Sequence, residues 1–197
     1  MVHSGFARLA LQRVPGLIAI LCLLSLTAAV AGGPSVAVDP TRSSVEISVK
    51  ATVGSFVAQL KEFDAAVTES AQTGQIATAD FRFNFDSIKT GNADRDSDMN
   101  VWQQTAKFAE VVFTLTALEP AADGKSIAHG QLHFHGVERP VSFAVTIDLK
   151  NPVITIDGDA TIDTRDYGLP VIKKLLVLKV DPVVLVHFHL EGRLTGT

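Results

Sequence analysis

Apolar and polar residues alternate with a period of two along most of the chain from Val45 toward the C-terminus. Residues 45–49 place Val, Ile and Val on one face of an extended strand, and residues 81–85 place three phenylalanines on one face of another. Residues 141–147 repeat the pattern with Val, Phe, Val and Ile. A chain with many half-buried strands and few helices to cover them closes its sheet into a barrel or folds it into a sandwich.

The alternation, bounded by turn residues, predicts nine strands. They are expected at Ser44–Val53, Phe56–Phe63, Ala65–Ser70, Ile76–Phe85, Val111–Leu118, Lys125–His135, Val137–Leu149, Val153–Ile162 and Val183–Leu194. Most joints are short turns such as Thr73-Gly74 and Asp123-Gly124, too short for a parallel crossover. The sequence therefore predicts an all-β, antiparallel meander.

One stretch, between Ile88 and Phe108, breaks this rhythm. Asn92 is the expected N-cap of a short helix, and aspartates follow it in the first turn, where they favour the helix dipole. Met99 and Trp102 are three residues apart and share one face of this helix. The helix is expected either to pack against the sheet or to close one mouth of a barrel.

Residues 1–31 have the pattern of a cleaved signal peptide. Arg8 and Arg13 supply positive charge, residues 17–26 form an apolar run, and Ala29-Val30-Ala31 is a small-residue cleavage pattern. An uncleaved anchor is the alternative, but the apolar run is shorter than the roughly 20 residues that a membrane span needs. We expect one domain, residues 32–197, behind an export leader.

Net charge and cysteine content then limit the kinds of partner and cross-link that we expect. Removing residues 1–31 takes away two of the 17 basic residues and none of the 21 acidic ones, so the formal net charge changes from −4 to −6. The single cysteine, Cys22, is lost as well, so the mature chain cannot form a disulfide and depends on its core. A net negative chain without a basic stripe is not expected to bind nucleic acid.

Six short motifs follow one another in order along the chain. They are Asp39-Pro40, Ile88-Lys89-Thr90-Gly91-Asn92, Arg95-Asp96, His135-Gly136-Val137, Arg139-Pro140-Val141 and Arg165-Asp166-Tyr167-Gly168-Leu169. Together they resemble the YceI-like family of polyisoprenoid-binding proteins. The resemblance implies a lipocalin-like antiparallel β-barrel of about eight strands, exported to the periplasm of a Gram-negative bacterium. It also implies that the barrel holds a long isoprenoid chain, such as the tail of a quinone.

A barrel of eight strands either fills its lumen with side chains or encloses one slim ligand. The apolar side chains that we expect to face the lumen and contact a lipid are Ile47, Phe81, Phe83, Phe85, Trp102, Phe113, Phe134, Phe143 and Phe188. A polar head group needs one or two polar partners at the mouth, and the candidates are Arg95, Arg165 and Tyr167. Neighbouring aspartates or loop carbonyls are the alternative partners of the two arginines.

The function expected from these residues is a non-catalytic periplasmic carrier or store for a polyisoprenoid or an isoprenoid quinone, without a cofactor. The apolar segment Leu169–Val180, punctuated by Lys173, Lys174 and Lys179, could form a flap that transiently touches a membrane surface, or could simply be buried. The sequence does not decide whether two barrels pair as a homodimer.

Two histidine pairs carry the alternative function. His133 and His135 share a face of one strand, and His187 and His189 share a face of the last. They could bind a metal or a haem only if the two strands were neighbours. An enzyme acting on a hydrophobic substrate is the third alternative, although the chain lacks the Gly-x-Ser-x-Gly and His-Glu-x-x-His motifs of known hydrolases.

Overall fold

The computed structural model describes residues 33–150, 152–174 and 178–195 of the chain. The predicted leader, residues 1–31, lies outside the described residues. Within those ranges, no helix is both long enough and apolar enough to pass through a bilayer.

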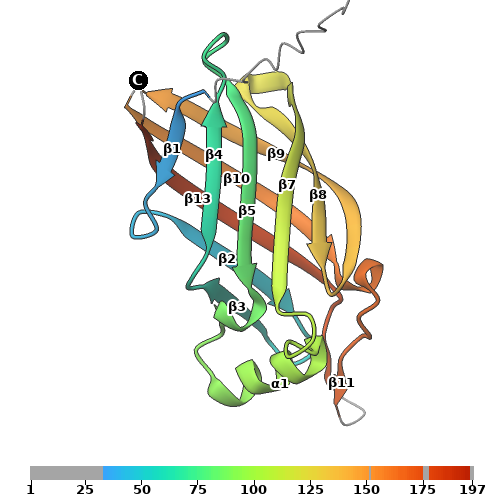
Figure 1. The fold of residues 1–197 in the computed structure, drawn as a ribbon. Helices are drawn as coiled ribbons and strands as arrows, with labels where there is room; N and C mark the ends of the chain where they lie inside the picture. The colour runs from blue at the N-terminus through green and yellow to red at the C-terminus, as the bar shows by residue number, and fades with distance from the viewer. Residues whose placement is uncertain (1–32, 151, 175–177, 196–197) are drawn as a thin grey trace, which may run out of the picture. The chain divides into compact units, whose positions relative to one another are not determined.

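Eight antiparallel strands form a closed barrel (Figure 1). In order around the wall they are β1 (Ser35–Val38), β4 (Asp64–Glu69), β5 (Ile76–Asn84), β7 (Glu110–Pro120), β8 (Ser126–Phe134), β9 (Val137–Lys150), β10 (Val153–Asp163) and β13 (Val183–Thr195). The barrel closes because β13 pairs with β10 on one side and with β1 on the other. The predicted antiparallel barrel of about eight strands is therefore confirmed.

Three further strands extend the wall at one end of this barrel. The N-terminal half of β13 pairs with β2 (Ser44–Lys50), and β2 pairs with β3 (Ser55–Leu60). The two-residue strand β6 (Ile88–Lys89) pairs with β3 and follows β5 after the 3-10 turn η1 (Phe85–Ser87). Helix α1 and the small β11–β12 hairpin lie at this same end, at the bottom of Figure 1.

The nine predicted strands correspond to β2, β3, β4, β5, β7, β8, β9, β10 and β13, with ends displaced by a few residues. The predicted meander runs from β4 through β5, β7, β8, β9 and β10 to β13. It fails at the start of the chain, because β1 and β2 do not pair with each other: both pair with β13, one after the other along its length. Strand β1, which the sequence did not predict, has only four residues and completes the wall between β13 and β4.

Helix α1 spans Ala93–Gln103 and confirms the predicted helix. The side-chain oxygen of Asn92 accepts a hydrogen bond from the Arg95 N–H at 2.9 Å, which makes Asn92 the N-cap. Gln104 ends the helix in the left-handed region, with a φ of 56°. Met99 and Trp102 are partly buried and pack against the barrel core, as their shared face predicted.

Two clusters of buried apolar side chains border the lumen. One lies at the α1 end and includes Val45, Phe85, Phe134 and Tyr167. The other lies toward β1 and consists of Val36, Val67, Ile76 and Ile154. The space between them is the candidate site.

Candidate functional site

The lumen of the barrel holds a cavity of about 1020 Å³. Its wall is built mainly from the inward side chains of the barrel strands, which alternate with outward polar ones, and is predominantly apolar. Small-molecule sites typically enclose about 300–1000 Å³. The barrel thus encloses space for a ligand rather than filling its lumen with its own side chains.

Nine predicted apolar contact residues line this cavity: Ile47, Phe81, Phe83, Phe85, Trp102, Phe113, Phe134, Phe143 and Phe188. Phe85 and Phe134 are also core residues, 6% and 7% exposed, and their rings stack 5.8 Å apart. Phe143 lies deeper in the barrel, where its ring contacts Phe113 at 5.3 Å and Phe188 at 5.7 Å. The structure brings these residues to one surface; their contact with a lipid stays a prediction.

Glycines in the wall let the rings lie against it. Gly158 pairs directly with Phe188 across β10 and β13, and a Cβ placed on Gly158 would lie 2.5 Å from the Phe188 ring carbon Cζ. Gly130 gives the Phe113 ring the same room on β8. Five alanines also line the cavity, and their small side chains occupy little of its space: Ala58, Ala65, Ala79, Ala128 and Ala160. The Phe188 and Phe113 rings lie against glycines of the wall, and alanines occupy other positions that face the lumen. The centre of the lumen therefore stays open.

The mouth of the cavity lies between α1 and the hairpin formed by β11 (Lys173–Lys174) and β12 (Leu178–Lys179). The indole Nε1–H of Trp102 donates to the Pro170 carbonyl at 2.8 Å, joining the helix to the segment that leads into the hairpin. The Arg95 guanidinium lies over the Phe56 ring, 4.2 Å from its centroid. The helix and the hairpin together cover this end of the barrel.

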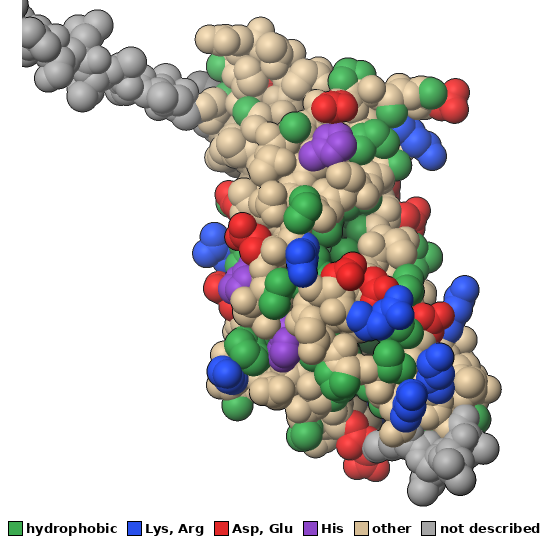
Figure 2. Space-filling view, turned by 90° about the vertical axis from the view of Figure 1, so that its right-hand side faces the viewer, with side chains coloured by type: hydrophobic (Ala, Val, Ile, Leu, Met, Phe, Trp, Pro, Cys, Tyr) green, Lys and Arg blue, Asp and Glu red, His purple; other side chains and the backbone are tan. Residues whose placement is uncertain are grey.

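Charged side chains gather at this same end. Apart from Asp80, the charged residues that line the cavity belong to α1 or to segment 170–182: Asp94, Arg95, Asp98, Lys173 and Asp181. In Figure 2, some of the blue Lys and Arg side chains lie toward the lower end of the molecule, and others lie higher on the wall among red Asp and Glu side chains. The cavity is therefore apolar along its length and polar at one mouth.

Of the three predicted head-group residues, Arg95 lines the cavity, whereas Arg165 and Tyr167 do not. Arg165 forms a two-pronged ion pair with Asp163, with Nε–Oδ1 at 2.9 Å and Nη2–Oδ2 at 2.5 Å. The hydrogen bond from Arg165 lowers the pKa of Asp163. For Arg165, the structure therefore shows the alternative to head-group binding that the sequence offered, an ion pair with a neighbouring aspartate.

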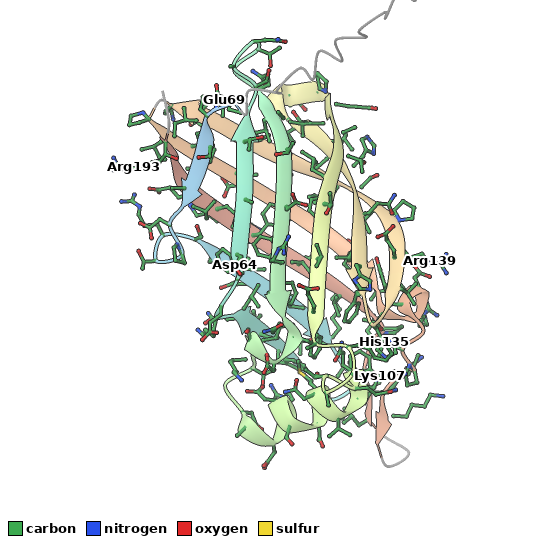
Figure 3. The ribbon with its side chains drawn as sticks, viewed as in Figure 1. Asp64, Glu69, Lys107, His135, Arg139 and Arg193 are labelled. Atoms are coloured by element: carbon green, nitrogen blue, oxygen red, sulfur yellow. The ribbon has the colours of Figure 1, made fainter. Side chains whose placement is uncertain are left out.

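Tyr167, in the 3-10 turn η3 (Thr164–Tyr167), is 2% exposed and packs its ring 5.3 Å from that of Phe134. Burial raises the pKa of its hydroxyl, and the nearby Asp166 raises it further. Tyr167 borders a second, smaller hollow of about 520 Å³ on the wall between β9 and β10, together with Arg139. In Figure 3, Arg139 points away from the barrel.

The two histidine pairs do not meet. His187 and His189 lie on β13 and His133 lies on β8, two strands that β9 and β10 separate. His135 lies beyond the end of β8, in the turn to β9 with a φ of 50°, so the prediction that it shares a strand face with His133 is wrong. On β13, His187 Nδ1 lies 2.9 Å from Asp159 Oδ1 and His189 Nδ1 lies 2.6 Å from Asp157 Oδ1. His135 Nδ1 donates to the Tyr167 carbonyl at 2.9 Å, at the α1 end of the barrel (Figure 3). In the described part of the chain, no group of three or more His, Cys, Asp or Glu side chains is placed to hold a metal.

Sequence reasoning missed part of the mouth. Val171, Ile172, Leu178 and Val180 line the cavity from the hairpin segment, which the sequence left open as a flap or a buried run. Their signal was the long apolar composition of that segment, but composition does not say which surface a hairpin covers. Val53 was predicted as the last residue of a strand but was not named as a contact; it lies in the turn between β2 and β3 and lines the mouth.

Three solved structures share this architecture. BcnA from Burkholderia cenocepacia is 22% identical over 78% of this chain and 98% of its own, with a TM-score of 0.69. A polyisoprenoid-binding domain from Saccharophagus degradans, implicated in plant cell wall breakdown, is 17% identical over 82% of this chain and 98% of its own, with a TM-score of 0.63. The YceI protein of Campylobacter jejuni is 16% identical over 71% of this chain and 85% of its own, with a TM-score of 0.60. These likenesses establish the shared fold.

A search of curated proteins by sequence found no match. The family model of the YceI-like domain, in contrast, matches residues 37–192, which include all eight strands of the barrel wall at least in part. The resemblance inferred from the short motifs is thereby confirmed. The chain belongs to the YceI-like domain family.

Proposed function

We propose that this protein binds an isoprenoid lipid, either a polyisoprenoid or an isoprenoid quinone, in its barrel cavity and carries or stores it without catalysis. The observation that carries the proposal is the open apolar cavity of about 1020 Å³. A barrel of this size can instead be filled by its own side chains. The polyisoprenoid-binding domain from Saccharophagus degradans, with the same fold, supports the same class of ligand.

The energetics of the wall favour a long apolar chain. Burying apolar chain contributes roughly 0.8 kcal/mol per CH₂, so several isoprene units suffice for tight binding without any polar contact. The phenylalanine rings offer flat surfaces to such a chain along the lumen, as the contacts of Phe143 with Phe113 and Phe188 indicate. Affinity then depends on the tail far more than on the head group.

The polar head would lie at the mouth between α1 and the hairpin. Arg95 is the predicted head-group residue that lines this mouth, and its guanidinium is held over Phe56. Arg165 would have to leave Asp163 to reach a ligand. We therefore assign the head-group contact to Arg95.

Residues 1–31 would direct the chain to the periplasm and be removed there, leaving residues 32–197 as the binding protein. The intact mass of the exported protein tests this step, because cleavage after Ala31 defines one mass. Retention of the leader would contradict it.

The binding proposal is tested with a pair of adjacent substitutions on β4. Ala65 lines the cavity, whereas the exposed Ala66 lies on the opposite face of the strand. We expect Ala65→Trp to place an indole in the lumen and displace the lipid, and Ala66→Trp to leave lipid content unchanged. The measurement is mass spectrometry of an organic extract of each purified protein.

A prenyl lipid in extracts of the wild-type and Ala66→Trp proteins, and its loss from a folded Ala65→Trp protein, is the expected result. Circular dichroism checks that each variant is folded. Equal lipid content in both variants, or wild-type extracts without any prenyl lipid after expression in a bacterial periplasm, would overturn the proposal.

A further inference from the structure

The mouth of the cavity has an exposed surface that carries apolar and basic side chains together. The β2–β3 turn and the hairpin are joined there, because the Thr52 N–H donates to the Lys179 carbonyl at 3.0 Å and the Lys179 N–H donates to Thr52 Oγ1 at 3.0 Å. Ala51 also forms a β-bridge with Val180. The turn and the hairpin thus form one continuous edge of the mouth.

Two valines project from opposite sides of this mouth. Val53, in the β2–β3 turn, is 70% exposed, and Val101, on α1, is 75% exposed; both also line the cavity. They are the two most exposed large hydrophobic residues of the described chain. Scattered surface valines need no explanation, but two that flank the opening of an apolar cavity mark a candidate contact surface.

Three lysines belong to the segments that form this edge: Lys50 ends β2 just before the turn, and Lys173 and Lys179 pair with each other in the hairpin. Lys50, Lys173 and Lys179 are all exposed, and within the described ranges no ion pair occupies any of them. We call Lys50, Val53, Val101, Lys173 and Lys179 the rim surface. On the other side of the mouth, α1 carries the exposed Asp94 and Asp98. The exposed Asp181 follows the hairpin, so lysines outnumber carboxylates on the described part of the turn and the hairpin.

We propose that the rim surface docks on a bilayer that contains anionic lipids, so that the cavity mouth opens onto the membrane. This inference rests on the proposed function, because a lipid must enter or leave the cavity through such a mouth. The valines would dip among the head groups, and the lysines would contact lipid phosphates. Apart from its leader the chain has an excess of acidic residues, so only a local basic surface can hold it on an anionic bilayer.

The test is flotation of the purified protein with vesicles of phosphatidylcholine mixed with phosphatidylglycerol, compared with vesicles of phosphatidylcholine alone. We expect binding to the mixed vesicles that weakens as salt is added. Lys179→Glu should weaken it at least about fivefold, since each lysine near an anionic surface contributes about 1 kcal/mol. Lys125→Glu is the matched control, because Lys125 is exposed next to the turn η2 (Ala122–Gly124), at the far end of β7 from α1.

A second pair of variants tests the apolar contact. Val53→Asp should abolish vesicle binding, whereas Val57→Asp should not, because Val57 is 49% exposed on β3 but does not line the mouth. Lys179 does not line the cavity, so extracts of purified Lys179→Glu protein should contain the same lipid as wild-type extracts. A failure of docking is therefore separable from a failure of lipid binding.

Three outcomes would overturn the docking proposal. They are equal flotation with both kinds of vesicle, equal losses for Lys179→Glu and Lys125→Glu, and no flotation of the wild-type protein at low salt. If the rim surface instead joins two copies of the chain, light scattering would show a dimer that Lys179→Glu dissociates, without vesicle binding.

Discussion

Single small residues decide how much of the lumen stays open. Gly158 and Gly130 make room for the rings of Phe188 and Phe113 at the wall, and alanine occupies positions where a larger side chain would cross the lumen. The same phenylalanines could have formed a solid core had these neighbours been valine or leucine. Ring placement, rather than the number of aromatic residues, therefore sets the volume of the cavity.

Gly158→Val is expected to push the Phe188 ring into the lumen and reduce the lipid content of the purified protein. Overpacking of this kind typically costs about 1–3 kcal/mol of stability. Mass spectrometry of extracts and urea unfolding measure the two effects. Thr161→Val, on the exposed outer face of the same strand, serves as the control and should change neither. An unchanged lipid content in Gly158→Val would show that Phe188 does not limit the cavity.

Phe134 and Phe143 should respond differently to truncation, although both line the cavity. Phe134 is 7% exposed and packed among core residues, so Phe134→Ala should cost about 3–5 kcal/mol. Phe143 borders the open lumen and is only partly buried, so Phe143→Ala should cost clearly less. Urea unfolding of the lipid-free proteins measures both values. Equal losses would mean that Phe143 belongs to a solid core.

Helix α1 is anchored to the barrel through its first turn as well as through Trp102. Asp96 Oδ1 accepts hydrogen bonds from the Thr90 N–H at 2.9 Å and from the Thr90 hydroxyl at 2.6 Å, just beyond β6. Partial burial pushes the pKa of Asp96 up, but these hydrogen bonds outweigh it and bring the pKa below 3.8. The ionised carboxylate therefore holds the helix over the mouth.

Acid should release this anchor. Because the pKa of Asp96 is lowered in the folded protein, its stabilisation is complete above pH 3.8 and is lost as the pH falls through the lowered value. Trp102, the single tryptophan of the chain, reports the change by fluorescence. Thr90→Ala should raise the midpoint of this acid transition, and Asp96→Asn should remove the part due to Asp96. A transition identical in all three proteins would assign it to another group.

At the scale of the whole molecule, the proposed lipid would stabilise the folded barrel. No disulfide joins the strands of residues 32–197, because the chain has one cysteine and that residue is Cys22. Closure depends on the strand ladders and on the two apolar clusters at either side of the cavity. A lipid that fills the space between the clusters would contact both and bind the folded state alone.

Removal of the lipid should therefore lower the melting temperature. A ligand present at 100 times its Kd contributes about 2.7 kcal/mol, and for a domain of this size that corresponds to about 5–10 °C. Calorimetry of the protein before and after organic extraction, and after reconstitution with an isoprenoid lipid, measures the shift. The Ala65→Trp protein is the control and should show no shift. A wild-type melting temperature that does not depend on lipid would contradict ligand-linked stability.

The alternation of residue types by itself determined nine of the strands and the inward phenylalanines, because side-chain direction in a strand follows directly from position. The short turns determined the antiparallel sense, because they leave no room for a parallel crossover. Asn92 and the aspartates after it likewise determined where α1 begins, since capping is a local interaction. The short motifs were enough to predict the family.

Only the tertiary structure decided which strands close the barrel, because β1 is too short to show a pattern and pairs with the far end of the chain. It also decided that the lumen is hollow, because this depends on which glycine of one strand lies beside which phenylalanine ring of the next, as Gly158 does with Phe188. The structure also chose between the alternatives that the sequence left open for two arginines: Arg95 lines the mouth, whereas Arg165 is held by the neighbouring Asp163. Contacts between residues distant in sequence, which no local pattern encodes, decided both the closure of the barrel and the open lumen.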